Sequence, residues 1–208
     1  MFRTEKINFG EVNVHLLYYT DFNINDYLSC LLPEEIERLN EFSSETRKKE
    51  FLATRYLRTQ LVGKTPVLYS DIGAPYLSSG DYISISHAKE VVGIASCPSF
   101  PIGFDLEPIH EKVLRVKHKF LHPSELVGFD VDDVTELIKI WSAKEALYKL
   151  SGSKGLHFTR DLIVEKINAT EWKGKILEEI TEKTVHLSIQ QISNFIVSIS
   201  TQPLKLSR

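Results

Sequence analysis

Two carboxylates stand on alternate positions directly after an apolar stretch, in residues 102–108 (IGFDLEP). In an extended chain, residues i and i+2 project to the same face, so Asp105 and Glu107 would point the same way. Their charges would then repel each other. Such a pair is stable in water, on a strand edge or a turn, or around a cation. For the isolated pair, the solvated edge or turn is the favoured interpretation.

A helical pattern over residues 134–152 (VTELIKIWSAKEALYKLSG) supplies a third carboxylate. Its period places Ser142, Glu145 and Lys149 on one face, and apolar side chains cover much of the remaining circumference. This polar stripe must face either solvent, as a Glu145–Lys149 surface pair, or a cleft. Combined with the two acids above, Glu145 would complete an oxygen-rich site of the kind that Mg²⁺ prefers.

Two further stretches carry groups that can bind phosphate. In residues 83–95 (ISISHAKEVVGIA), Ser86 and His87 fall at the end of a predicted strand, although a lone His more often satisfies local backbone groups. No GxSxG motif accompanies them, so a hydrolase triad is not supported. In residues 45–61 a helical wheel gathers four basic side chains in one arc, which indicates a phosphate, an acidic partner or a solvated face: Arg47, Lys48, Arg55 and Arg58.

The composition excludes several classes of protein. The 208 residues are 42% hydrophobic and 25% charged, with a net charge of −3, so no global excess of positive charge indicates nucleic acid. Cys30 and Cys97 do not form a CxxC motif or a zinc spacing. The N-terminal stretch lacks the continuous apolar region of a signal peptide, and no apolar run approaches the length of a membrane span. We therefore expect a cytoplasmic protein without a membrane or nucleic-acid partner.

The spacing of apolar residues predicts helices and antiparallel strands in each half of the chain. In the first half we expect a strand at 13–20, a helix from Pro33, a helix at 45–62, a turn and a short extended piece at 71–77, and strands at 81–87 and 91–97. In the second half we expect a helical stretch at about 111–120, a short helix that starts within 122–125, and a helix at 134–152. Strands are expected at 160–167, 174–180, 184–191 and 194–201. The predicted fold class is α+β, with two similar halves, 1–100 and 101–208, related by a pseudo-twofold axis. Each half is expected to pack helices on a small antiparallel sheet, and the active site is expected at the interface between the halves.

Four motifs in this order resemble those of the 4′-phosphopantetheinyl transferases. IGFDLEP resembles their G-[IV]-D-x-E motif, and WSAKEALYK (141–149) resembles their W-[ST]-x-K-E-[AS]-x-x-K motif. ISHAKEVVGIA resembles their SH-containing strand pair, and FLHPSE (120–125) resembles their short F-x-x-x-E element. The resemblance runs from about residue 33 to the last strands, and the chain length is similar to that of the larger, two-halved type of the family. Where relatives often have Gly-Lys-Pro, with a lysine that helps to hold coenzyme A phosphate, this chain has Gly73-Ala74-Pro75.

The resemblance implies an enzyme that moves the phosphopantetheine arm of coenzyme A onto a serine of an acidic acyl or peptidyl carrier protein and releases 3′,5′-ADP. It implies Mg²⁺ on Asp105, Glu107 and Glu145, with Glu145 also the base for the carrier serine, either directly or through a metal-bound water. Lys144 matches a diphosphate-binding lysine, and Lys149 matches one that stabilises the leaving phosphate. For the 3′-phosphate the resemblance implies Ser86 and His87, with Arg38, Arg47 and Lys48 as helpers. It also implies a monomer.

Two other functions remain open on the sequence alone. Ala74 would suit a non-catalytic regulator that binds coenzyme A, and the carboxylates alone would suit a Mg²⁺-dependent phosphohydrolase. The retained WSAKEALYK motif favours the transferase. A carrier could dock on residues 111–122, where five basic residues alternate with Val113, Leu114, Val116, Phe120 and Leu121, although these apolar residues could equally be the core face of an ordinary amphipathic helix.

Overall fold

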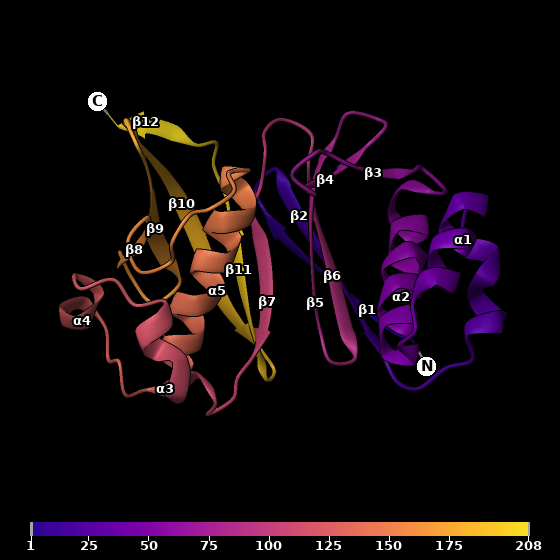
Figure 1. The fold of residues 1–208 in the computed structure, drawn as a ribbon, viewed down its shortest axis with the longest axis horizontal. Helices are drawn as coiled ribbons and strands as arrows, with labels where there is room; N and C mark the ends of the chain where they lie inside the picture. Colours follow the sequence, from indigo (N-terminus) through magenta and orange to yellow (C-terminus); the bar gives the residue numbers. More distant parts are fainter. Residues whose placement is uncertain (1, 208) are drawn as a thin grey trace.

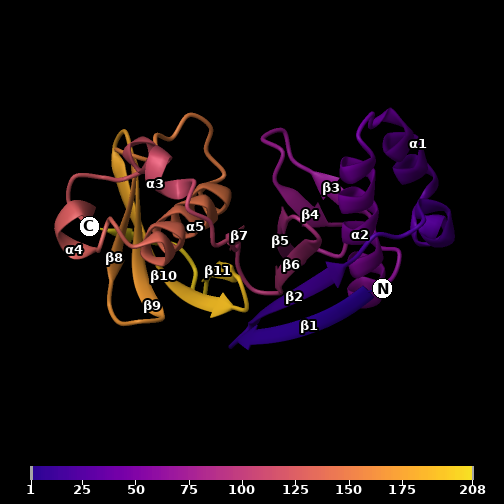
Figure 2. The ribbon, with the colours of Figure 1, turned by 90° about the horizontal axis from the view of Figure 1, so that it is seen from below.

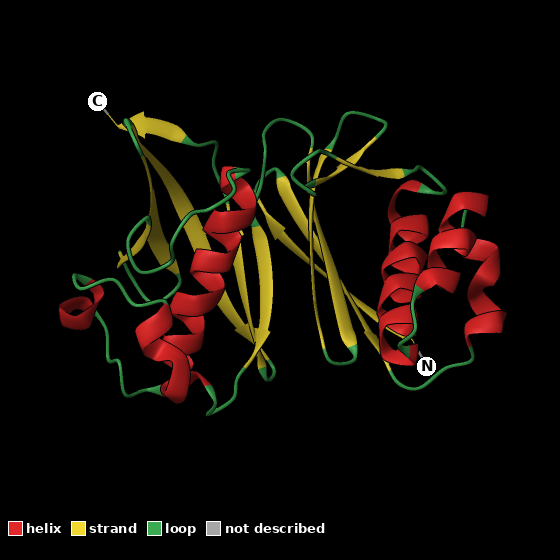
Figure 3. Ribbon diagram, in the orientation of Figure 1, coloured by secondary structure: helices red, strands yellow, loops and turns green. Residues whose placement is uncertain are grey.

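The computed structural model describes residues 2–207 as two antiparallel sheets, each covered by helices on one side (Figures 1 and 3). The first sheet has the strand order β1-β2-β6-β5-β4-β3. The second has the order β7-β11-β10-β9-β8, with β12 also paired to β10. The expected fold class, α+β with two similar halves, is confirmed.

In the first half, a long helix packs against the first sheet. Its elements are β1 (Phe2–Phe9), β2 (Val12–Tyr19), the 3-10 helix η1 (Ile24–Cys30), α1 (Pro33–Glu41), α2 (Glu45–Val62), β3 (Val67–Tyr69), β4 (Pro75–Leu77), β5 (Tyr82–Ala88) and β6 (Val91–Cys97). Helix α2 begins where the Ser44 hydroxyl accepts a hydrogen bond from the Arg47 amide, and it ends at Gly63, whose φ is +64°. Ala53 and Leu57 of α2 are buried in the core beneath this sheet.

In the second half, one helix crosses a face of the second sheet. The elements are β7 (Phe104–Pro108), α3 (Val113–Val116), the 3-10 turn η2 (Lys117–Lys119), α4 (Glu125–Gly128), α5 (Val134–Ser151), β8 (Leu162–Lys166), β9 (Glu171–Glu178), β10 (Thr181–Ile192), β11 (Phe195–Ser200) and β12 (Lys205–Ser207). The Asp133 carboxylate caps α5 by accepting from the Glu136 amide, and Gly152 ends the helix in the left-handed region.

Long, strongly periodic segments match the predicted elements, and the differences lie in short ones. The helix expected at 111–120 is only the single turn α3 followed by η2, whereas the short helix starts at Glu125, within the expected 122–125. Strands β1, β3 and β12 and the helix η1 were not predicted. Strand β1 is paired only to β2, and its side chains are mostly polar and partly exposed, so it lacks the apolar alternation of the central strands.

The two sheets meet where β7 lies along β5, as Figure 2 shows. Apolar residues of β2 and β6 pack there against Phe104, Leu106, Val197 and Ile199 of the second sheet. A Cβ atom on Gly93 would lie 2.6 Å from the Phe104 ring, so the close approach of the sheets requires glycine in β6. Because the sheets share this core, the division into domains 1–100 and 101–208 stays a prediction.

None of the helices within residues 2–207 combines the length and the apolar character that crossing a membrane requires.

Candidate active site

Strand β7 points its two carboxylates to the face that α5 covers. Trp141 Nε1 of α5 donates a hydrogen bond to Glu107 Oε1 at 3.0 Å, and Lys149 Nζ of α5 lies 2.8 Å from Asp105 Oδ1. The intervening Leu106 points the other way, into the core between the sheets. The alternation expected of an extended strand therefore holds, and Asp105 and Glu107 share one face.

Glu145 joins these two acids from α5, and the electrostatics of the three carboxylates are coupled. Burial, followed by the nearby charge of Asp105, raises the pKa of Glu145 to about 7. Burial and then Asp105 also raise the pKa of Glu107 to about 7, with a further contribution from Glu145 and an opposing one from the Trp141 hydrogen bond. Partly desolvated like charges of this kind become stable when a cation approaches them.

Asp105 is the most deeply buried of the three acids, with 3% of its surface exposed. Its Oδ1 accepts from Ser86 Oγ at 3.0 Å and from Lys149, whereas its buried Oδ2 has no hydrogen-bond partner. As the side chains stand, no group of three or more His, Cys, Asp or Glu residues within 2–207 gathers closely enough to hold a metal ion. The donor set nevertheless suits Mg²⁺ in kind, because it consists of carboxylate oxygens and leaves one buried oxygen unpartnered.

A basic pocket of about 210 Å³ lies on the α2 side of β5, and its lining includes Arg47, Glu50, Arg55 and His87. Arg47 Nη1 lies 3.0 Å from His87 Nε2, and His87 Nδ1 lies 3.8 Å from a Glu50 oxygen. Since a guanidinium can only donate, Nε2 is the acceptor and the imidazole is neutral in this arrangement. Burial lowers the pKa of His87, an effect that Glu50 opposes and Arg47 reinforces.

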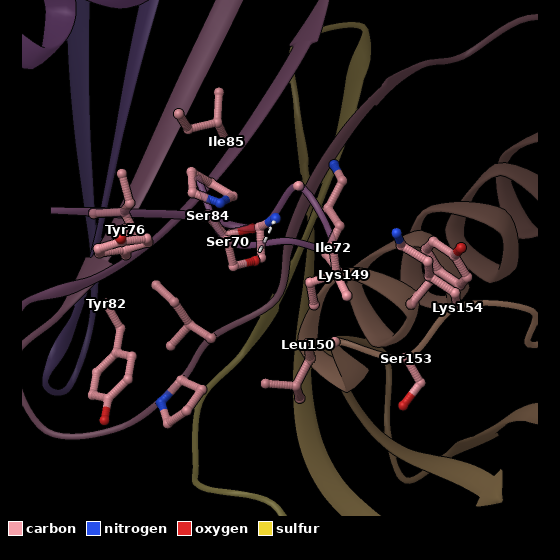
Figure 4. A pocket seen from close by; sticks show the side chains of 18 residues that line it. Ser70, Ile72, Tyr76, Tyr82, Ser84, Ile85, Lys149, Leu150, Ser153 and Lys154 are labelled. Atoms are coloured by element: carbon pink, nitrogen blue, oxygen red, sulfur yellow. Dashed lines mark hydrogen bonds between the residues drawn. The ribbon is translucent and has the colours of Figure 1, made fainter. Parts of the chain in front are cut away.

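A junction cavity of about 490 Å³ opens between the two halves, and its lining includes Lys149, which pairs with Asp105 (Figure 4). Tyr76 and Tyr82 of the first half line one side of it, and Lys149 and Leu150 of α5 line another. Its wall shares Gly73, Pro75 and Ile85 with the basic pocket, so the two spaces adjoin. A ligand with an apolar or aromatic part and several anionic groups would suit this continuous space.

The structure does not bring Lys144 to this site. Lys144 has no exposed surface, and its ammonium donates to the carbonyl oxygens of Phe120 (2.6 Å) and Phe158 (2.9 Å) and pairs with the Glu125 carboxylate at 2.8 Å. These three contacts use all three of its protons. Lys144 therefore holds α5 to the loops beside it, which differs from the diphosphate contact that the resemblance implied.

Other expected residues are also placed differently. The Ser86 hydroxyl is buried and already hydrogen-bonded, and Ser142 is wholly buried, so the expected polar stripe of α5 is reduced to Glu145 and Lys149. Neither Arg38 nor Lys48 is among the described residues that line the cavities, although the Arg38 guanidinium lies 5.6 Å from the centre of the Tyr69 ring at the edge of the basic pocket.

The basic arc of α2 is not a continuous ligand-binding face. Arg55 and Arg58 are buried, and both pair with Glu35 of α1, at 2.7 Å and 3.0 Å. Arg47, at the N-terminal end of the same arc, is exposed and reaches the basic pocket. The helical wheel gave the direction of these side chains correctly, but it could not show that Glu35 covers part of the arc.

Sequence reasoning missed two features of the site. Trp141 was treated as an apolar helix residue, yet it donates to Glu107. Lys154, just beyond α5, lines the junction cavity and donates to the Asp71 carbonyl at 3.2 Å across the two halves. It thus brings a positive charge to the loop that carries Ala74. No local pattern marked either contact, since both join segments far apart in the chain.

Comparisons with known proteins find matches in the part of the chain that carries the three carboxylates. Residues 101–200 match the family model described as the 4′-phosphopantetheinyl transferase superfamily, and this range includes both β7 and α5. The chain is 26% identical over 115 residues to a protein of Aneurinibacillus migulanus named 4′-phosphopantetheinyl transferase gsp. The aligned part covers 52% of this chain and 48% of the relative, so the chain spans about half the length of the curated relative that it matches.

The buried Lys144–Glu125 pair yields a test of stability. Replacing Lys144 by Met leaves Glu125 as an unpaired buried charge, and we expect the free energy of unfolding in urea to fall by about 3–5 kcal/mol. Lys139→Met, on the partly exposed side of the same helix, is the matched control and should change stability by less than about 0.5 kcal/mol. A stable Lys144→Met variant with impaired ligand binding would instead return Lys144 to the site.

Proposed function

We propose that this chain transfers the phosphopantetheine arm of coenzyme A onto a serine of a carrier protein, because residues 101–200 match the family model described as the 4′-phosphopantetheinyl transferase superfamily. The transfer releases 3′,5′-ADP. The observation that carries the proposal is the meeting of Asp105 and Glu107 with Glu145 and Lys149, beside a cavity that adjoins a basic pocket.

Asp105, Glu107 and Glu145 would hold Mg²⁺. The raised pKa values of Glu107 and Glu145, which come first from burial and then from the neighbouring Asp105, support this assignment, as does the unpartnered Oδ2 of Asp105. When bound, the ion would neutralise charge that builds on the diphosphate. The Lys149 ammonium balances the negative charge of Asp105 and also donates to the Phe104 carbonyl at 3.1 Å. Because Lys149 also lines the junction cavity, we propose that its ammonium contacts the leaving phosphate.

Glu145 is the proposed proton acceptor for the carrier serine. Within residues 2–207 no side chain donates a hydrogen bond to its carboxylate, so both of its oxygens are available. Without a metal its pKa is about 7, and a bound cation would lower this pKa, so the carboxylate would be ionised and able to accept a proton at neutral pH.

Coenzyme A would span the junction cavity and the basic pocket. Arg47 and His87 are suited to the 3′-phosphate, and Lys154 supplies positive charge that the chain lacks at Ala74. Arg38 and Lys48 are proposed only as outer helpers. Ser86 and Lys144 are left out, since their polar groups are already bonded within the protein.

An acidic carrier protein would dock beside the site, on the segment from α3 to α4. Val113, Phe120 and Leu121 are buried, so these members of the expected patch are core. The remaining surface combines exposed apolar side chains with basic ones: Leu114, Val116, Leu126, Val127, Lys112, Arg115 and Lys119. Val127, which is 93% exposed, is the most accessible of its apolar side chains.

We further propose a cytoplasmic monomer, because coenzyme A is cytoplasmic and both halves of one chain line the cavity.

The direct test incubates the protein with Mg²⁺, coenzyme A and several apo carrier proteins, and weighs the products. We expect one carrier to gain the mass of a single phosphopantetheine group and 3′,5′-ADP to appear. Asp105→Asn and Glu145→Gln should each fold and lose about 100-fold or more of the rate, because each removes charge that stabilises the transition state. The exposed Glu171→Gln is the control and should transfer normally.

Three other outcomes would contradict parts of this proposal. Coenzyme A binding without transfer to any carrier would indicate a non-catalytic regulator. Hydrolysis of a phosphate ester without a carrier would indicate a phosphohydrolase. Wild-type rates in Asp105→Asn or Glu145→Gln at saturating Mg²⁺ would remove these acids from the metal site.

The basic pocket predicts a preference for the 3′-phosphate. His87→Ala should weaken the binding of coenzyme A by about tenfold or more and should weaken the binding of 3′-dephospho-coenzyme A much less. The reason is that only coenzyme A has the 3′-phosphate to which His87 would donate a charge-assisted hydrogen bond. Since the neutral imidazole must be protonated to donate from both nitrogens, and burial lowers the pKa of His87, the wild-type preference should increase only as the pH falls below the ordinary histidine range. Calorimetric titration of both ligands measures this, and equal losses would show that His87 is structural.

The α3–α4 surface predicts an effect on the carrier alone. The double reversal Arg115→Glu and Lys119→Glu should raise the KM for the carrier, most strongly at low salt, and leave the KM for coenzyme A nearly unchanged. The same charge change at two remote exposed positions, Lys6→Glu with Lys205→Glu, is the control. An unchanged carrier KM, or a collapse of coenzyme A binding, would place the docking surface elsewhere.

A further inference from the structure

Each carboxylate of β7 is held through one oxygen by a neutral donor from another element. Ser86 Oγ of β5 donates to Asp105 Oδ1 at 3.0 Å, and Trp141 Nε1 of α5 donates to Glu107 Oε1 at 3.0 Å. The two donors therefore come from opposite halves of the chain. Their shared property is that they orient a carboxylate without adding positive charge.

Both donors are themselves fixed. The Ser86 oxygen accepts a hydrogen bond from the Leu106 amide at 3.2 Å, so its single proton is directed to Asp105. The Trp141 ring stacks on Phe158 and meets the edge of Phe120, each with ring centres 5.3 Å apart. Neither side chain can rotate away without breaking these contacts, so the two carboxylates keep their directions.

The anchoring divides the three acids into two kinds. Asp105 and Glu107 each have one oxygen fixed, and the Oδ2 of Asp105 has no hydrogen-bond partner. Glu145 receives no hydrogen bond from any side chain in the described part of the chain. The site thus combines two carboxylates that side chains orient with one that no described side chain holds by a hydrogen bond.

We propose that Ser86 and Trp141 are positioning residues that orient Asp105 and Glu107 toward a divalent cation. The inference rests on the proposed function, because it takes these acids as metal ligands. It gives Ser86 a role different from contact with the 3′-phosphate. It also explains why neutral groups stand here: a lysine in either place would compete with the cation for the same negative charge, as Lys149 does at Asp105 Oδ1.

The chain offers a matched control for each donor. Ser198 of β11 is the register partner of Asp105 and is wholly buried, but its hydroxyl has no hydrogen-bond partner. Trp172 of β9 is wholly buried, and its Nε1 has none either. Ser198→Ala and Trp172→Phe therefore repeat the changes Ser86→Ala and Trp141→Phe without removing a bond to a carboxylate.

The test measures Mn²⁺ binding by the electron paramagnetic resonance signal of the free ion, with coenzyme A present. Ser86→Ala and Trp141→Phe should each weaken the binding of Mn²⁺ by about tenfold or more, because removing a group that orients a metal ligand typically lowers the metal affinity by this amount. Ser198→Ala and Trp172→Phe should keep the wild-type affinity even where they lower the melting temperature. Ser86→Thr, which keeps the hydroxyl, should restore most of the affinity.

Three results would overturn the inference: unchanged Mn²⁺ affinity in both Ser86→Ala and Trp141→Phe, equal weakening in the controls, or no Mn²⁺ binding by the wild-type protein. Failure of the proposed function is separate and visible in the same samples. Wild-type protein that binds Mn²⁺ with the expected dependence on Ser86 and Trp141, but modifies no apo carrier, would keep the positioning roles and refute the transferase.

Discussion

The free edge of β7 is the constraint on which the rest of the structure depends. One side of β7 pairs with β11, and the amides on its other side point toward β5 and would be buried without partners. Side chains of β5 satisfy them: Ser84 Oγ accepts from the Phe104 amide at 3.1 Å, and Ser86 Oγ accepts from the Leu106 amide. Two serines spaced by two residues thus replace a backbone ladder. The sheets can meet there without merging, and Asp105 lies between the halves.

Buried ion pairs fix the helices around this junction. Glu35 of α1 pairs with two arginines of α2, and Glu125 pairs with Lys144 of α5. Further hydrogen bonds hold these pairs: Arg58 donates to the carbonyl oxygens of Cys30 and Thr65, and Glu125 accepts from the His122 and Val164 amides. Charged residues next to the site therefore divide into those that hold the fold and those left able to meet a ligand.

The sequence allowed prediction of the long elements and of the meeting of three acids, for a clear physical reason. A period of two residues in β7 and of 3.6 residues in α5 fixes directions within each element, so Asp105, Glu107 and Glu145 could be expected on facing surfaces. What lies opposite a side chain is set by tertiary packing. Lys144 meets the Phe120 and Phe158 carbonyls, and Arg55 meets a carboxylate twenty residues earlier in the chain, and neither contact leaves a local pattern. Short strands such as β3 and β12 are likewise defined by their partners and not by their own three residues.

The junction cavity has a thermodynamic consequence. Its lining comes from both halves, and the Lys154–Asp71 contact crosses it. A molecule bound there contacts surfaces that exist together only while the sheets remain docked. By linkage, it stabilises the docked state by RT ln(1 + [L]/Kd), which is about 2.7 kcal/mol at a hundredfold excess over Kd. With such a molecule bound, the resistance of this protein to heat would depend on the concentration of free ligand as well as on the sequence.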